Sequence, residues 1–69
     1  MSEHTYKIVE LVGSSKESSD DAIRNAITKA GESIKHMRWF QVVETRGYID
    51  NDNVAYWQVT IKVGFTVGE

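Results

Sequence analysis

The sequence predicts an α+β fold with the element order β-α-β-β. Residues 6–12 are rich in β-branched and aromatic residues, as is typical of a strand. Apolar residues then recur at helical spacing from Ala22 to Met37. Two long β-prone segments follow, residues 38–50 and 54–67, and turn residues separate them. We therefore expect one strand, one helix and a hairpin.

The first strand is expected to stop at Gly13, and residues 13–17 have the composition of a loop. Ser18, with Asp21 three residues later, resembles a helix-capping arrangement. The apolar stripe that follows predicts a helix of about 18 residues with Gly31 inside it. The members of the stripe are Ala22, Ile23, Ala26, Ile27, Ala30, Ile34 and Met37.

The hairpin is expected to turn at residues 50–53, which read Asp-Asn-Asp-Asn. Each of its strands has about twelve residues, or about 40 Å when fully extended. One short helix can cover a whole face of such strands only if the sheet curls around it.

Alternation along the hairpin assigns its side chains to two faces of the sheet. The face expected to pack on the helix carries Trp57, Val59, Ile61, Val63 and Phe65, with Phe40 and Val42. The opposite face, here called the helix-free face, then carries Trp39, Gln41, Val43, Thr45, Tyr56, Gln58 and Thr60, provided that no bulge intervenes. This face is semi-apolar, and such a patch usually marks contact with a partner or a ligand.

A chain of 69 residues forms one domain, residues 1–69, with a small core. It has no cysteine and only two histidines, so a disulfide is excluded and a metal site is not expected. Small domains without these supports often depend on self-association, which we expect here.

The formal net charge of −2 and the scattered lysines and arginines argue against nucleic-acid binding. No apolar run is long enough to span a bilayer, and the first residues lack the features of a signal peptide. We therefore expect a cytoplasmic protein that binds neither nucleic acid nor membrane.

Four stretches, KIVELVGSS at 7–15, WFQV at 39–42, ETRG at 44–47 and QVTIKVGF at 58–65, resemble bacterial-type flavin-binding dodecins in order and spacing. The resemblance implies a three-stranded antiparallel sheet curled around one helix, with twelve copies forming a hollow homododecamer. It also implies that FMN or riboflavin-type flavins bind in pairs near two-fold axes.

The resemblance further assigns roles to three residues. Trp39 matches the family tryptophan that stacks on the isoalloxazine, and Gln58 matches the glutamine that hydrogen-bonds to the polar edge of the ring. Arg46 matches an arginine near the flavin tail, although the alternation above places it on the face opposite to Trp39. Some family members also bind coenzyme A through basic surface residues. Thr66 stands where many members have arginine, which disfavours that second ligand here.

These residue types also suit a flavin on chemical grounds. Indole is an electron-rich platform for a flat, electron-poor ring, and offset stacking contributes about 0.5–1.5 kcal/mol beyond area burial. A primary amide offers both a donor and an acceptor to the pyrimidine edge.

The expected function is therefore flavin storage and sequestration, with protection against flavin photochemistry and without catalysis. One alternative is a flavin-dependent redox enzyme, but the sequence shows no nicotinamide fingerprint, paired acid and base, or reactive cysteine. The other alternative is a structural oligomer without a ligand, in which the Trp39 face is only an interface.

Overall fold

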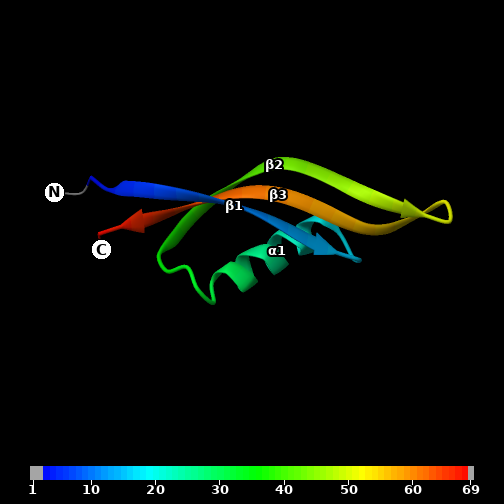
Figure 1. The fold of residues 1–69 in the computed structure, drawn as a ribbon, viewed down its shortest axis with the longest axis horizontal. Helices are drawn as coiled ribbons and strands as arrows, with labels where there is room; N and C mark the ends of the chain where they lie inside the picture. Colours follow the sequence, from blue (N-terminus) through cyan, green and yellow to red (C-terminus); the bar gives the residue numbers. More distant parts are fainter. Residues whose placement is uncertain (1–2, 69) are drawn as a thin grey trace.

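The computed structural model describes residues 3–68 and has the predicted element order. Strand β1 spans Thr5–Ser15, helix α1 Ser19–Ala30, strand β2 Met37–Asp50 and strand β3 Asn53–Val67. The strands lie in the order β1-β3-β2, and β3 is antiparallel to both neighbours. The predicted β-α-β-β fold with a three-stranded antiparallel sheet is thus confirmed. Figure 1 shows α1 along one side of the sheet and the β2–β3 hairpin reaching beyond it.

The start of α1 follows the capping prediction. The Ser18 side chain accepts a hydrogen bond from the backbone N–H of Asp21 at 3.0 Å. The buried Ser15 hydroxyl donates to the Asp21 carboxylate at 2.6 Å and accepts from the Glu17 N–H at 2.9 Å. These bonds satisfy helix-end and loop donors that would otherwise lack partners.

The end of α1 corrects the prediction of about 18 residues, because the helix has 12 and stops at Ala30. Gly31 is the C-cap and donates its N–H to the Ile27 carbonyl at 2.9 Å. Ile34 and Met37 therefore continue the apolar stripe without being helical. Met37 begins β2 and packs against the core from there.

The core lies between α1 and the central strand. Ala22 and Ala26 of the helix pack with Val59, Ile61 and Val63, all of them buried. This arrangement confirms the apolar face predicted for β3. Trp57 lies at the end of that face but is only half-buried and stays outside the core cluster, contrary to its expected core role.

The sequence predicts a strand that stops at Gly13, but β1 continues to Ser15 and Gly13 lies within it. Gly13 there allows the close approach of α1. A Cβ atom at this position would collide with the backbone oxygen of Ala22 and with the Ala26 side chain. The helix consequently packs on β1 and β3.

Strand β2 is left uncovered by the helix. Every residue of β2 after Met37 is exposed, including Phe40 and Val42. Register places these two side chains opposite Val63 and Ile61, on the predicted face. The prediction that they lie on the helix side of the sheet is thus confirmed, but α1 lies over β1 and β3 and leaves both side chains exposed.

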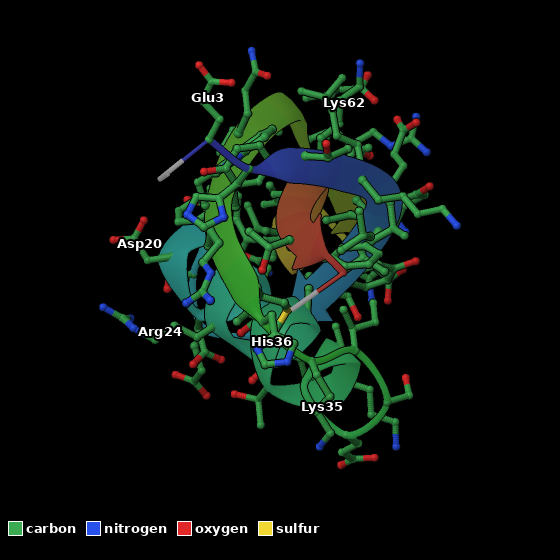
Figure 2. All side chains as sticks on the ribbon, turned by 90° about the vertical axis from the view of Figure 1, so that its left-hand side faces the viewer. Glu3, Asp20, Arg24, Lys35, His36 and Lys62 are labelled. Carbon is green, nitrogen blue, oxygen red and sulfur yellow. The ribbon has the colours of Figure 1, made fainter. Side chains whose placement is uncertain are left out.

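Figure 2 views the molecule along its long axis, so that the two faces of the sheet can be distinguished. Lys62 of β3 points away from the helix, whereas Lys35 and His36 lie at the helix side. His36 has a φ of 65° in the connection that leads into β2. No helix within residues 3–68 is long and apolar enough to cross a membrane.

Candidate functional site

Trp39 lies on the helix-free face, directly opposite Gly64 of β3. Its indole occupies the space above Gly64, where a Cβ atom would overlap with the ring. The Tyr6 ring lies beside the same indole in a T-shaped contact, with the ring centroids 6.5 Å apart and the planes inclined by 62°. Trp39 is 40% exposed, so the ring is supported on one side and accessible on the other.

The neighbours of Trp39 on the first strand extend this apolar patch. Ile8 flanks Gly64 on the β1 side and is 53% exposed. Thr66 of β3, opposite Tyr6, is 5% exposed, and its hydroxyl has no hydrogen-bond partner among residues 3–68.

A second group of polar and aromatic side chains lies further along the same face. Arg46 is paired with Gln58 across the hairpin and donates from Nε to the Gln58 Oε1 atom at 3.0 Å. The hydroxyl of Tyr48 donates to the same oxygen at 3.3 Å. Tyr48 in turn stacks on Tyr56, with centroids 4.7 Å apart and planes inclined by 16°. We call Arg46, Tyr48, Tyr56 and Gln58 the amide cluster.

A β-bulge brings Arg46 onto this face and corrects two assignments. The register shifts between Val42 and Glu44, so that Val43 is an extra residue in β2. Beyond an extra residue the side chains change faces. Arg46 therefore shares the helix-free face with Trp39, contrary to the simple alternation. Thr45, predicted on that face, instead lies opposite Val59 on the helix side.

Trp39 and Gln58 do not meet within one chain, although they share a face. Trp39 lies opposite Gly64, which is six residues from Gln58 along β3. At about 3.3 Å per residue, this separation is roughly 20 Å. The structure therefore joins Arg46 to Gln58 and keeps both of them away from Trp39.

A hollow adjoins the amide cluster on the side of β1. It has a volume of about 470 Å³ and is lined by Ser14, Ser15, Lys16, Tyr56 and Gln58. Its size lies in the range of small-molecule sites, which is about 300–1,000 Å³. Residues 3–68 contain no group of three or more side chains suited to hold a metal ion.

Sequence reasoning missed Tyr48 as a member of the site. The alternation of β2 would have placed it beside Gln58 only after the extra residue at Val43 was counted. Two adjacent valines give no sign of which one is extra.

Comparisons with known proteins agree with this architecture. The family model described as Dodecin matches residues 5–68. The Dodecin of Thermus thermophilus is 44% identical over 64 residues, which cover 93% of each chain. The solved dodecin from Streptomyces davaonensis is 47% identical with a TM-score of 0.93, covering 99% of this chain and 100% of its own.

The structure of dodecin from Streptomyces coelicolor is equally similar. It has 45% identity and a TM-score of 0.93, and the match covers 100% of this chain and 99% of the other. A family match over nearly the whole sequence, together with these relatives, shows that the chain belongs to the dodecin family.

Proposed function

We propose that this protein binds and stores flavin, as FMN or a riboflavin-type molecule, in an assembly of identical subunits and without catalytic turnover. The observation that carries the proposal is the half-exposed indole of Trp39, supported from below by Gly64. A platform of this kind offers a broad electron-rich surface to a flat electron-poor ring.

Stacking on indole also has a photochemical consequence. Indole can donate an electron to a photoexcited flavin and return it to the ground state before reactive products form. This chemistry suits sequestration and protection. The same close contact would quench the fluorescence of a flavin bound at Trp39, which gives the proposal a direct signal.

The separation of the two groups supports self-association. The platform at Trp39 and the amide of Gln58 lie roughly 20 Å apart on one chain. A flavin that contacts both residue types therefore meets Trp39 of one subunit and the amide cluster of another. When two identical faces meet across a two-fold axis, Trp39 of each subunit can lie beside the amide cluster of the other. We propose a homododecamer, in keeping with the resemblance of the sequence.

Within this proposal the flavin-binding residues are Trp39, Gln58 and Arg46. Trp39 provides stacking, while Gln58 and Arg46 provide the polar contacts from the amide cluster. We propose flavin rather than coenzyme A as the ligand. Position 66 carries a buried threonine and therefore presents no cation at the surface.

A flavin titration with native mass measurement tests this function. Wild-type protein is expected to quench the fluorescence of added FMN, and to run as a large assembly. Trp39→Ala should lose most of the affinity while its native mass stays unchanged. Trp39→Phe should quench more weakly than the wild type, because a phenyl ring is a smaller and poorer electron donor.

Trp57→Phe is the matched control, since it makes the same exchange on the helix side of the sheet and should quench as the wild type does. A colourless protein that ignores FMN would point to a purely structural oligomer. Steady oxidation of NADH or NADPH by the flavin-loaded protein would contradict storage and favour a redox enzyme.

A further inference from the structure

Two hydrogen bonds occupy the side-chain oxygen of Gln58. Arg46 donates to it from Nε at 3.0 Å, and Tyr48 donates to it from its hydroxyl at 3.3 Å. An amide oxygen has two lone pairs, so both of its acceptor positions are in use. The amide nitrogen of Gln58 has no hydrogen-bond partner within residues 3–68.

The two donors are themselves held in place. Tyr48 stacks on Tyr56 at 4.7 Å, and the Arg46 guanidinium lies 5.8 Å from the centre of the Tyr48 ring. Aromatic stacking and the cation–π contact both restrict the rotamers of these side chains. The amide of Gln58 is therefore oriented before any ligand arrives.

This orientation directs the amide nitrogen away from β2. Arg46 and Tyr48 both belong to β2, so they draw the oxygen of Gln58 toward that strand. The nitrogen, on the other side of the amide carbon, then faces β1. On that side lies the 470 Å³ hollow that Gln58 lines together with Ser14, Lys16 and other residues.

We infer that Tyr48, acting with Arg46, is a positioning residue that makes Gln58 present hydrogen-bond donors only. The matching ligand group is an acceptor without a proton, such as a ring carbonyl of a flavin, rather than a ring N–H. This inference rests on the proposed function and adds that Gln58 is the donor, and the ligand the acceptor, of their hydrogen bond.

Gln58→Glu tests the polarity. The carboxylate keeps the shape of the side chain and still accepts from Arg46 and Tyr48, but it has no N–H to offer. Losing that donor opposite a carbonyl should weaken FMN binding about tenfold. If the ligand instead donated an N–H to Gln58, the variant would bind FMN as tightly as the wild type or more tightly, and the inference would be overturned.

Gln41→Glu is the matched control for this substitution. Gln41 lies on the same face, opposite Lys62, and the exchange adds the same charge. Its FMN affinity is expected to stay within about twofold of the wild type, since surface charges are screened over short distances at ordinary ionic strength. An equal loss of FMN affinity in both variants would mean that the added charge alone causes it. That result would refute the inference that Gln58 donates a hydrogen bond to the ligand.

Tyr48→Phe tests the positioning role. It keeps the ring on Tyr56 and removes the hydroxyl, so Gln58 loses one of its two anchors. FMN affinity should fall about two- to fivefold. The quenching of bound flavin by Trp39 and the native mass should not change. Unaltered affinity would show that Tyr48 does not position the amide.

FMN binding by the wild type and by Gln58→Glu, taken together, distinguishes a failure of this inference from a failure of the proposed function. A wild type that ignores FMN would overturn both. A wild type that binds FMN while Gln58→Glu binds equally well would overturn only the polarity. A crystal structure of the ligand-free assembly in which Arg46 and Tyr48 donate to different acceptors would refute the anchoring of Gln58 without reference to any flavin.

Discussion

The indole of Trp39 packs on Gly64, its cross-strand neighbour, and fills the space that any other side chain at position 64 would occupy. The glycine thus determines how deeply the ring sits on the sheet. A ring that rests on backbone has one broad face left for a ligand, and the inclined Tyr6 ring beside it limits its rotation. The flat surface that Trp39 offers to a ligand therefore depends on residues of all three strands and not on the tryptophan alone.

Gly64→Ala should therefore impair flavin binding without touching any residue that contacts the flavin. The added Cβ atom would overlap with the indole, so Trp39 must tilt or move outward. We expect FMN affinity to fall about tenfold or more, equivalent to about 1.4 kcal/mol, and bound flavin to be quenched less. Fluorescence titration measures both quantities.

Gly47→Ala provides the comparison, because it makes the same exchange on β2, opposite Trp57. A Cβ atom at Gly47 would lie 3.5 Å or more from its neighbours, which is ordinary contact. This variant should bind FMN normally and be as stable as the wild type or slightly more stable. Equal losses of FMN affinity in Gly64→Ala and Gly47→Ala would refute the role of Gly64 in placing the Trp39 ring.

Gly13→Ala is expected to destabilise the fold itself. The new methyl group would meet the Ala22 carbonyl and the Ala26 side chain, so α1 must move away from the sheet. Overpacking of this kind typically costs about 1–3 kcal/mol, and occasionally more where backbone must shift. Urea unfolding at equal protein concentrations would measure the loss. Stability equal to that of Gly47→Ala would contradict the close packing of helix and strand.

Ser18→Ala should weaken the start of the helix. It removes the oxygen that accepts the Asp21 N–H, which for an N-cap costs about 1 kcal/mol. Ser19→Ala removes a hydroxyl one residue later, and this hydroxyl makes no hydrogen bond within residues 3–68. The exchange should change the unfolding free energy by less than about 0.5 kcal/mol. Equal losses would mean that Ser18 does not cap the helix.

The elements that the sequence predicts correctly are those with local signals. The helix start depends on Ser18 and Asp21, which are three residues apart, and the structure has the expected bond. The helix end was mispredicted because Ile34 and Met37 keep the helical spacing beyond Gly31. Both side chains remain half-buried, and spacing alone does not distinguish a helix from a loop that packs on the same core.

The candidate site was predictable only up to the bulge. Alternation along β2 and β3 correctly assigns Trp39 and Gln58 to the same face of the sheet. This rule holds only where no extra residue interrupts a strand. Past Val43 the same rule fails, and the positions of Arg46 and Tyr48 had to come from the three-dimensional register. The separation of Trp39 from Gln58 along β3 likewise depends on which residues pair, and alternation does not contain that information.

The bare strand β2 yields a final prediction about assembly. Phe40 is 46% exposed and borders a groove of about 270 Å³ with Ile23 and Ile27 of α1. In the proposed assembly a second copy of the chain covers this strand. A 69-residue domain buries little apolar surface within one chain, and an exposed apolar patch usually marks a contact with a partner. Phe40→Glu would then bury a carboxylate at each interface, and its desolvation costs several kcal/mol even though Arg24 lines the same groove.

The assembly should accordingly dissociate in Phe40→Glu, and its native mass should fall toward that of smaller species at micromolar concentration. Flavin binding should disappear with it, since the platform and the amide cluster come from different subunits. Thr28→Glu adds the same charge at an exposed position of α1 and should leave the native mass unchanged. A Phe40→Glu protein that retains its full mass would mean that β2 is not covered by another copy at this position.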